Sequence, residues 1–470
     1  MATFWERLQT AARAAYIAWQ GITKPEDMPM LPGFSSSLEM TDTERIERYR
    51  LLWRYYRGEH RKHLKVRMTP AGPGPDDNVT INLSRRVVNK GVDFLFGKPL
   101  TWQLSENDQT PEEEMLERIW GSPEKRMGFF AELALNGGVT GDFYLQIVPP
   151  APGEELPRVV NLNPSIVFPK TDPNDISEEW AYELRWFRGD VLCRTIHALR
   201  EDGQSWETWD EQMGRGRWER ISDPALWPFA WPMIIHGKNL PNPNSYYGLS
   251  DLEDSDLNDY VNMTASNINR ITRIFAHPMI WARGFGKDAI SVDSSQMFLS
   301  QDDNAQMGAL ELGRNLASSQ DYLSFLRTAF AEITAVPQSD PERLSIGAQS
   351  GFALKVLFND LVLKTGIKRS LYGEALVETN RRLLDLMGMG ENNVSKLHWL
   401  DPLPVDGRES AEIDRFELDS EVVSRETVST RRGYDWEVEQ ERMVKDEKPK
   451  LVGATFTPAF GSSMEGAEDE

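Results

Sequence analysis

The amino-terminal third of the chain has apolar residues at the three- and four-residue spacing of amphipathic helices. This spacing predicts a short helix over residues 3–20 and, after a Pro- and Ser-containing linker, a basic helix over residues 43–65. A third helix is expected over residues 83–96, because Gly and Pro in the sequence at 97–99 are typical of a helix exit. Residues 111–136 have the same helical spacing and predict a fourth helix.

The pattern then changes to the two-residue alternation of β-strands. Short segments rich in Val, Ile, Tyr and Trp are separated by turn sequences such as Arg188-Gly-Asp190. This alternation predicts an antiparallel β meander over about residues 142–236. The expected strands are Phe143–Val148, Val159–Phe168, Trp180–Phe187, Val191–Leu199, Trp206–Trp209 and Arg217–Ile221.

Helical spacing returns at Ser250 and predicts a helix to about residue 275, roughly 40 Å long at the α-helical rise. Ser250 and Glu253 have the spacing of a capping box, which satisfies two backbone donors at a helix start. The first turns hold five carboxylates and no base, whereas Arg270 and Arg273 lie in the last turns. This distribution of charge complements the helix dipole.

Two further long helices are predicted downstream. Residues 277–316 have weak strand signals, and a helix is expected from Ser318 to Ala335, where Pro337 follows. After a polar, turn-prone stretch, the longest helix is expected from about Ser350 to about Met387, roughly 55 Å. Gly366 and Gly373 lie inside it and indicate a bend or close packing. Residues 408–445 form another helical set, and the polar, acidic tail at 449–470 is typical of disorder.

Length and composition indicate an ordinary multidomain protein. A chain of 470 residues is too long for one compact core. No run of 18 apolar residues is present, and the first residues do not resemble a secretion signal. Cys193 is the single cysteine, which excludes an internal disulfide and fits a reducing cytoplasm.

The charge balance is strongly acidic, with 52 basic and 73 acidic residues and a net charge of −21. Tight DNA binders neutralise phosphates with Lys and Arg, so this chain as a whole should repel DNA. A conduit through which DNA slides would benefit from that repulsion. The simpler interpretation is that an acidic surface keeps the protein soluble.

Candidate catalytic motifs are weak. Residues 91–99 superficially resemble a phosphate-binding loop, but the glycine spacing is wrong and Pro99 replaces the magnesium-binding hydroxyl. His60 and His63 are one turn apart without further ligands, so they are interpreted as surface histidines on a basic helix. Cys193 is expected to be a packed thiol. The acidic run at 251–259 could gather a cation, although a solvated helix start is the simpler interpretation.

One basic segment, residues 45–67, has aromatic residues between its arginines and lysines. Such a composition can bind nucleic acid through phosphate contacts and stacking. In a chain this acidic, contact with a neighbouring subunit or a plain exposed surface is the favoured alternative.

Six segments, in this order, resemble elements of the portal proteins of long-tailed bacteriophages. The second is the most specific, and together they extend from about residue 55 to residue 445. They are Tyr55-Tyr-Arg-Gly-Glu-His60, Asn82 to Pro99, Gly141-Asp-Phe-Tyr-Leu145, Tyr247-Gly-Leu-Ser-Asp-Leu252 with the Asn-rich helix after it, Gln349-Ser-Gly-Phe-Ala-Leu-Lys355, and Val422-Val-Ser-Arg-Glu-Thr427.

The resemblance implies an α+β fold, mainly α, with the parts of a portal subunit. Long stem and wing helices would accompany an antiparallel β meander in the wing, a small α/β clip and a helical crown. The implied parts are the wing (1–249), two stem helices (250–275 and 318–336), the clip between them (276–317), a tunnel loop (337–349), a long wing helix and return (350–407), the crown (408–447) and the tail (448–470).

The resemblance also implies the function of a portal. The family forms a ring of twelve subunits at one capsid vertex, through which double-stranded DNA is packaged and ejected without sequence specificity. Expected partners are the terminase large subunit, a head-completion adaptor, and capsid and scaffold proteins. The family has no catalytic residues, so we expect no enzyme activity, metal or cofactor. Assembly would take place in the host cytoplasm, and the finished protein would lie in the virion.

Two sets of site residues follow from this resemblance. For Arg343 as well as for Arg270 and Arg273, surface salt bridges between subunits are the favoured alternative to DNA contact. The DNA-channel candidates are Gln338, Ser339, Asp340, Glu342, Arg343, Arg270 and Arg273, and the partner-docking candidates in the clip are Trp281, Arg283, Phe285, Lys287 and Phe298.

Three other classes of protein are the alternatives. Another head–tail connector component would be shorter and would lack two long helices around a strand-bearing insert. A metal-dependent nucleic-acid enzyme would use the acidic cluster at 251–259, and Asp254→Ala would abolish its activity. A membrane-surface protein would use the helix at 3–20, but its mixed charge and the acidic chain argue against attraction to anionic lipid.

Overall fold

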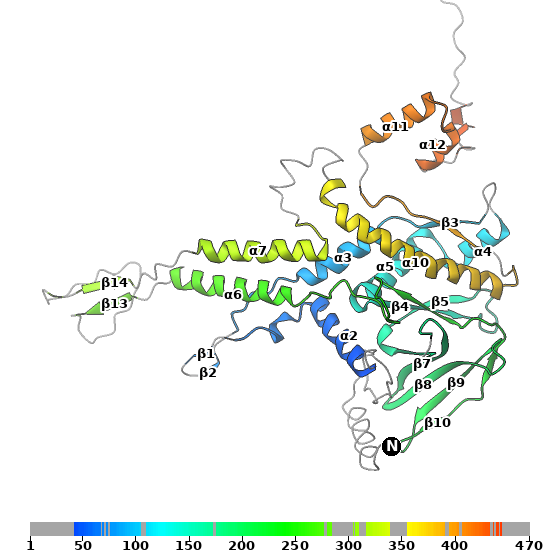
Figure 1. Cartoon of the computed structure of the whole chain (residues 1–470), viewed down its shortest axis with the longest axis horizontal. Helices are drawn as coiled ribbons and strands as arrows, with labels where there is room; N and C mark the ends of the chain where they lie inside the picture. The colour runs from blue at the N-terminus through cyan, green and yellow to red at the C-terminus, as the bar shows by residue number, and fades with distance from the viewer. Residues whose placement is uncertain are drawn as a thin grey trace, which may run out of the picture. The chain divides into compact units, whose positions relative to one another are not determined.

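A computed structural model describes most of the chain between residues 42 and 443, in two compact units, Met1–Leu403 and Pro404–Glu470 (Figure 1). The helix predicted over residues 3–20 and the predicted acidic tail lie outside the described residues. The described residues are 42–66, 68–69, 72–73, 76–104, 110–172, 175–276, 280–283, 304, 306–309, 316–338, 355–390, 394–403, 407–432, 436, 439–440 and 442–443.

The first helices end where glycine allows the chain to turn. Helix α2 (Asp42–Arg57) is shorter than predicted, because Gly58 adopts a φ of +80° and a 3₁₀ turn, η2 (His60–Lys62), follows it. Helix α3 (Leu83–Phe96) has the predicted bounds. Asn82 caps it by accepting a hydrogen bond from the backbone N–H of Arg85.

The single helix predicted over residues 111–136 is two helices. α4 (Pro111–Trp120) ends at Gly121, which has a φ of +76°, and α5 (Pro123–Thr140) begins immediately afterwards. Proline is tolerated in the first turn of a helix but not in its interior, so the break falls before Pro123. A capping box formed by Thr110 and Glu113 fixes the start of α4.

The predicted meander is divided between two antiparallel sheets. In the larger sheet the strand order is β10-β9-β8-β7-β6, and β11 also pairs with β9. The smaller sheet has the order β12-β4-β5. The strands are β4 (Asp142–Val148), β5 (Arg158–Leu162), β6 (Val167–Thr171), β7 (Glu179–Arg188), β8 (Val191–Leu199), β9 (Trp206–Met213), β10 (Trp218–Arg220), β11 (Ala225–Trp227) and β12 (Ile234–Lys238).

The strand predicted over residues 159–168 bends between the two sheets. Pro164 lacks a backbone donor, and the Asn163 side chain accepts the N–H of Ser165, so a 3₁₀ turn replaces the ladder there. The chain therefore leaves the smaller sheet at the end of β5 and enters the larger one at β6. The prediction of one continuous strand over residues 159–168 was therefore wrong.

The core of the first unit lies between the smaller sheet and its helices. The rings of Phe143 on β4 and Tyr372 on α10 (Asn359–Leu386) stack with their centroids 4.1 Å apart. Two glycines make room for them: a Cβ atom at Gly137 would lie 2.0 Å from the Tyr372 hydroxyl, and one at Gly237 would lie 2.1 Å from the Phe143 ring. These close approaches explain why glycine occupies both positions.

Helix α10 begins later than predicted, at Asn359, after a short helical turn at residues 355–357. Gly366 has open space where a Cβ would be, so the prediction of close packing is wrong there. Gly373 is buried, with a carbon of Leu397 3.7 Å from the ideal Cβ position. β15 (Lys396–His398), which contains that leucine, pairs with β3 (Thr101–Gln103) beside the helix.

In the described residues of the second unit, α11 (Gly407–Asp419) is followed by α12 (Arg425–Arg431). The turn between them includes Glu421 at a φ of +55°. Ser424 caps α12 by accepting the backbone N–H of Thr427. Arg432 closes the pair with an ion pair of 2.6 Å to Asp414 on α11. The mixed class of helices and antiparallel sheets is confirmed in the described residues.

Candidate functional site

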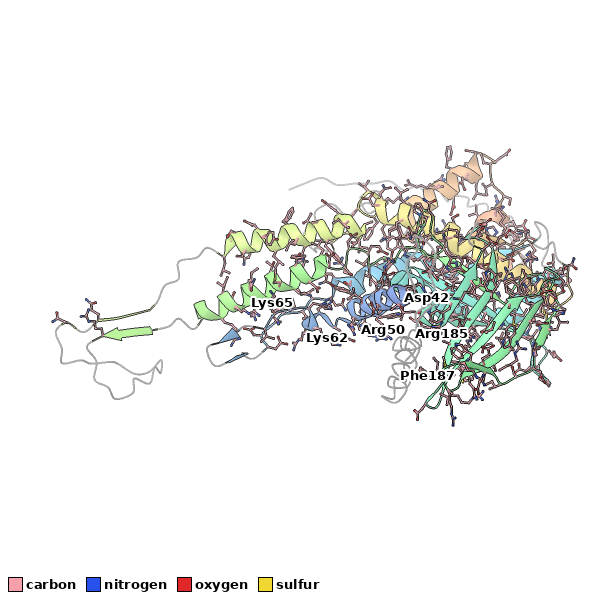
Figure 2. All side chains as sticks on the ribbon, turned by 60° about the horizontal axis from the view of Figure 1, so that its bottom comes forward. Asp42, Arg50, Lys62, Lys65, Arg185 and Phe187 are labelled. Carbon is pink, nitrogen blue, oxygen red and sulfur yellow. The ribbon has the colours of Figure 1, made fainter. Side chains whose placement is uncertain are left out.

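Two long helices run side by side in opposite directions and leave the core of the first unit (Figure 1). α6 (Leu257–Ala276) leads into β13 (Ile280–Arg283), which pairs antiparallel with β14 (Gln306–Ala309), and α7 (Ala317–Thr334) returns. The structure therefore contains the predicted arrangement of two helices around a strand-bearing insert. A second view shows the same pairing of α6 and α7 (Figure 2).

Asparagines on one face of α6 hold the helix against the segment that enters α3. Asn258 is fully buried, and its Oδ1 accepts hydrogen bonds from the backbone N–H groups of Leu83 and Ser84, both at 3.0 Å. Asn262 accepts the N–H of Ile81 at 2.7 Å. These groups satisfy donors at the start of α3 that have no partner within the helix. The asparagine-rich pattern thus has an anchoring role, which the sequence alone did not indicate.

The start of α6 differs from the prediction. Residues 251–256 form turns, and the helix begins at Leu257. Ser250 and Glu253 make only half of a capping box: the Glu253 carboxylate accepts the Ser250 N–H at 2.8 Å, but the Ser250 hydroxyl accepts from Leu252. The Ser250 hydroxyl also donates to Val139 at the end of α5, so tertiary contact replaces the local cap.

Asp251 is a buried ion-pair centre rather than part of a solvated acidic face. Its carboxylate lies 2.5 Å from the Lys368 ammonium and 3.1 Å from that of Lys364, both on α10. Gly91 and Gly138 flank the pair, and a Cβ at either would approach the carboxylate to 3.2 Å or less. Burial raises the pKa of Asp251, but the two ammoniums outweigh it and hold that pKa below its ordinary value.

Other carboxylates of the acidic run also have structural partners. Glu253 pairs with Arg48 on α2, and Asp259 accepts a hydrogen bond of 2.7 Å from the Tyr55 hydroxyl. The buried His60 imidazole lies 3.5 Å from the same Asp259 carboxylate. Burial opposes the charge on Asp259, but the nearby His60 imidazole and the hydrogen bond from Tyr55 outweigh it and lower the pKa of this carboxyl. The interpretation of His60 as a surface residue was wrong.

The acidic run does not gather carboxylates in the way that a metal site needs. Within the described parts of the chain, no three His, Cys, Asp or Glu side chains lie together with ligand geometry. Cys193 is a packed thiol on β8, as predicted, and burial raises its pKa. Among the same residues, no helix has the length and apolar character needed to cross a bilayer.

The basic, aromatic segment has both buried and exposed arginines. Arg45 is fully enclosed: it donates to the carbonyls of Pro164 and Val167, and its guanidinium lies over the rings of Tyr49, Phe168 and Tyr247. This arginine therefore joins α2 to the β-sheets and is not available to nucleic acid. Arg50, Lys62 and Lys65 lie along the outer side of α2 and the chain after it (Figure 2).

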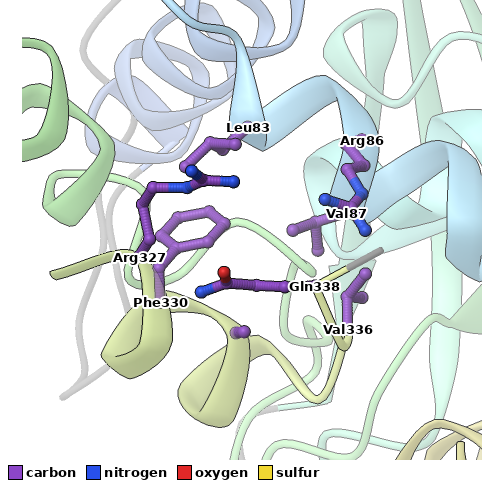
Figure 3. Close-up of a pocket in the computed structure, with 8 residues that line it drawn as sticks. Leu83, Arg86, Val87, Arg327, Phe330, Val336 and Gln338 are labelled. Atoms are coloured by element: carbon purple, nitrogen blue, oxygen red, sulfur yellow. The ribbon is translucent and has the colours of Figure 1, made fainter. Parts of the chain in front are cut away.

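The predicted DNA-channel residues are only partly described. Gln338 lies just after α7 and lines a small cavity of about 20 Å³ with Arg86 and Arg327 (Figure 3). Arg270 forms a 3.0 Å ion pair with Asp77 of the same chain, and Arg273 lies 3.7 Å from that carboxylate and is 63% exposed. Ser339, Asp340, Glu342 and Arg343 lie outside the described residues.

Two of the predicted partner-docking residues, Trp281 and Arg283, lie on β13. Trp281 on β13 pairs with Gly308, and Arg283 pairs with Gln306. Arg283 is exposed. Phe285, Lys287 and Phe298 lie outside the described residues.

Helix α7 has an exposed apolar stripe. The sequence predicted a single apolar face and did not distinguish these residues from the buried ones. The predicted apolar face splits in two: Leu326 and Phe330 are buried, whereas Tyr322, Phe325 and Ile333 are 51%, 65% and 56% exposed. On α6, Tyr260 and Met263 are similarly exposed. The exposed apolar side chains therefore lie on both long helices.

Comparison with known proteins gives the family. The chain matches the model of the family described as phage portal protein, SPP1 Gp6-like, over residues 36–433. No curated protein matches the chain significantly.

Solved structures of gene transfer agent (GTA) particles also match the chain. The neck of a native particle computed with C12 symmetry has 14% identity and a TM-score of 0.42, with 75% of this chain and 90% of that chain covered. The virion of a native particle has 12% identity and a TM-score of 0.39, with 90% of this chain and 99% of that chain covered. The neck of an empty particle computed with C6 symmetry has 13% identity and a TM-score of 0.38, with 77% of this chain and 94% of that chain covered.

The family match extends over most of the chain, and the described fold has the two helices and the strand-bearing insert expected of the class of phage portals. The chain belongs to the SPP1 Gp6-like family of phage portal proteins. The resemblance that the six sequence segments indicated is confirmed, as is the expected role in a capsid portal.

Proposed function

We propose that this protein forms a closed ring at one vertex of a viral capsid, and that double-stranded DNA passes through the ring during packaging and ejection. The observation that carries the proposal is the pair of long helices, α6 and α7, with apolar side chains exposed on both. A monomer in water gains nothing from this exposure. Side-by-side packing of copies would remove the surface from solvent.

The stripe on α7 has the geometry of a helix–helix contact. Tyr322, Phe325, Ala329 and Ile333 are spaced by three, four and four residues, so they lie along one side of the helix. The Tyr322 and Phe325 rings stack with their centroids 6.4 Å apart. The core-facing side of α7, with Leu326 and Phe330, lies next to this stripe. Helix α7 can therefore contact its own subunit and a neighbour at once.

The parts of a portal subunit are assigned on the same basis. α6 and α7 would form the stem, and the segment with β13 and β14 would form the clip. The residues after Pro337 would form the tunnel loop, with Gln338, Ser339, Asp340, Glu342 and Arg343 facing DNA. α10 would be the long wing helix, and the helices α11 and α12 would belong to the crown.

The proposed partners follow from this assignment. The terminase large subunit and a head-completion adaptor would dock at the clip through Trp281, Arg283 and their neighbours, and capsid and scaffold proteins would surround the wing. The protein would act as a conduit without catalysing a reaction. Its net charge of −21 supports passage of DNA of any sequence, because an acidic wall repels phosphates.

Electron microscopy and native mass spectrometry of the purified full chain test the proposal. We expect rings with a central hole and about twelvefold symmetry. Phe325→Glu with Ile333→Glu should abolish the rings, because two buried charges would face the neighbouring copy. Ser324→Glu, at an exposed position of α7 outside the stripe, should leave them intact. A uniform monomer or dimer of the unaltered chain at high concentration would contradict the proposed function.

A further inference from the structure

Helix α3 has a basic hollow on its outer side. The hollow is shallow and open to solvent, has a volume of about 300 Å³ and is lined by Asn82, Arg85, Arg86, Asn89 and Lys90. Three of these five side chains are cationic and two are amides, within a chain whose acidic residues outnumber its basic ones by 73 to 52. Such a concentration of positive charge favours an anionic occupant.

The walls of the hollow are held in place by α2. The Tyr56 hydroxyl donates to the Asn89 side chain at 3.1 Å, and the Arg85 guanidinium lies over the Tyr56 ring at 5.7 Å. The Asn82 amide donates to the Tyr56 carbonyl at 2.9 Å. Because these contacts order the side chains before any partner arrives, a docking partner would lose little side-chain entropy there.

Two further contacts mark the borders of the hollow. Arg86 donates to the carbonyl of Pro337 at 2.8 Å, which ties α3 to the chain that leaves α7 (Figure 3). Lys90 lies 3.5 Å from the exposed Asp93 carboxylate. Exposed ion pairs of this kind contribute little, so Lys90 can turn to a second carboxylate at small cost.

A concentrated acidic surface lies on the other side of α3. Glu253, Asp254 and Asp256 are exposed in the turns before α6, and no Lys or Arg occurs from Ser250 to Asp259. The opposite placement follows from the contacts of α3. Its residues Ser84 and Gly91 face the 251–258 segment, whereas the residues of the hollow project from the reverse side of the helix.

The acidic turn also lies near the start of α3, where the hollow begins. Asn258, two residues after Asp256, accepts hydrogen bonds from Leu83 and Ser84, beside the first residue of the hollow. A ring with rotational symmetry brings together surfaces of neighbouring copies at the same height along its axis. Surfaces of opposite charge on opposite sides of one helix fit such a repeating contact between copies.

We propose that the acidic turn of one copy, with Asp254 and Asp256, docks into the basic hollow formed by Arg85 and Lys90 on the next copy. The inference rests on the proposed ring and identifies a charged contact within it, separate from the apolar stripe on α7. The contact would fix the rotational setting of adjacent subunits, since charge pairs favour one register and penalise others.

Charge reversal tests this contact in the full chain. Arg85→Glu with Lys90→Glu places carboxylates in the hollow, and Asp254→Lys with Asp256→Lys reverses the turn. Each pair of substitutions should lower the proportion of protein in rings by about tenfold or more at a fixed concentration, because like charges then face each other. The fourfold variant, with both surfaces reversed, should restore ring formation.

A matched control separates the contact from net charge. Arg215→Glu with Arg217→Glu alters two exposed arginines in the β9–β10 turn and changes the net charge by the same amount as the hollow variant. These rings should form as in the unaltered chain. Circular dichroism melting checks that each variant is folded. The milder pair Arg85→Gln with Lys90→Gln should give an intermediate loss.

Carbodiimide cross-linking gives a second measurement that does not depend on substitutions. It joins a lysine directly to a carboxylate in contact, so mass spectrometry of unaltered rings should find Lys90 linked to Asp254 or Asp256. Rings mixed from isotopically light and heavy copies should contain light–heavy linked pairs, which shows that the link joins two subunits.

The outcomes separate failure of the inference from failure of the proposed function. If the unaltered chain forms no rings, both are overturned. If it forms rings and both reversed pairs also do so in the same proportion, only the docking contact is overturned. Intact rings of the Arg85→Glu, Lys90→Glu variant that no longer retain short duplex DNA, when unaltered rings do retain it, would assign the hollow to DNA phosphates instead.

Discussion

The ammonium of Lys368 on α10 lies 2.5 Å from the carboxylate of Asp251, and both side chains are almost completely buried. Through this contact the longest helix is joined to the chain that enters α6. Lys364 approaches the other carboxylate oxygen to 3.1 Å, so one anion lies between two lysine ammonium groups. Burial lowers the pKa of Lys368, and the nearby Asp251 opposes that effect by favouring the charged ammonium.

Removing the charge of Asp251 should destabilise the fold strongly. Asp251→Asn leaves two ammoniums near each other without a counter-ion, which we expect to lower the free energy of unfolding by about 3–5 kcal/mol. Denaturation in urea measures the loss. Asp254→Asn, at an exposed position, is the matched control and should change stability by less than about 0.5 kcal/mol. Equal stability of the two variants would show that the pair contributes nothing.

Stability should decrease as the solution is acidified through the range set by His197. This imidazole on β8 is 3% exposed and has a hydrogen bond of 2.8 Å with the Thr208 hydroxyl. Burial lowers its pKa from 6.5 to about 4. Between pH 6.5 and 4 the unfolded chain binds a proton at this histidine that the folded chain does not. The free energy of unfolding is therefore unaffected by His197 above about pH 6.5 and falls as the pH drops toward 4.

The loss attributable to His197 should reach about 3 kcal/mol at the acidic end, at about 1.4 kcal/mol per pKa unit. His197→Leu should remove this part of the pH dependence when unfolding free energies are measured between pH 4 and 7. Thr208→Val is the control, because it removes the hydrogen-bond partner and keeps the imidazole. Identical pH slopes in the unaltered chain and His197→Leu would refute the assignment.

A methyl group at Gly237 should disrupt the core. The Cβ of Gly237→Ala would lie 2.1 Å from the Phe143 ring, which already stacks on Tyr372. We expect a loss of about 1–3 kcal/mol, measured by thermal unfolding. Gly128→Ala is the matched control on the exposed side of α5, where the methyl group meets nothing within 4 Å. It should raise stability by up to about 1 kcal/mol, and a loss of the same size at both positions would argue against crowding as the cause.

The anchor of α6 should depend on the Asn258 side chain. Asn258→Ala leaves the buried N–H of Ser84 without its acceptor and removes one of two acceptors of the Leu83 N–H, at an expected cost of about 1–3 kcal/mol. Asn258→Asp keeps an acceptor but loses the donor to the Ile81 carbonyl, so its stability should be intermediate. Asn267→Ala, at an exposed position of the same helix, is the control. Hydrogen exchange of the Leu83 and Ser84 amides reports the effect directly.

Helices and strands could be predicted where residues close in the sequence determine their ends. The bounds of α3 and α7 agree with the sequence to within about two residues, because apolar periodicity and nearby Gly or Pro residues determine them. The weak strand signals predicted in residues 277–316 coincide in part with β13 and β14, but their pairing was not predicted. The helix break at Gly121-Ser-Pro123 was not predicted, although Gly and Pro are helix-breaking residues, because the helical spacing continues on both sides of it.

The candidate site was harder to predict, because its residues act through contacts between distant segments. Asp251 was assigned to an acidic, solvated helix start, and only the tertiary structure places Lys364 and Lys368, more than 100 residues later, against it. His60 was placed on the surface for the same reason, since nothing in the sequence around it shows that Asp259, far along the chain, packs against it.

By itself, the sequence determined the family, the order of helices and strands, and the acidic balance of the chain, since each depends on residue type and spacing. The tertiary structure decided which half of an apolar helix is core and which half is surface. On α7, Leu326 and Phe325 are adjacent and equally apolar, yet one is 5% and the other 65% exposed. The two exposed fractions differ because the rest of the subunit covers only one side of α7. The apolar periodicity of a single helix does not show which side is covered.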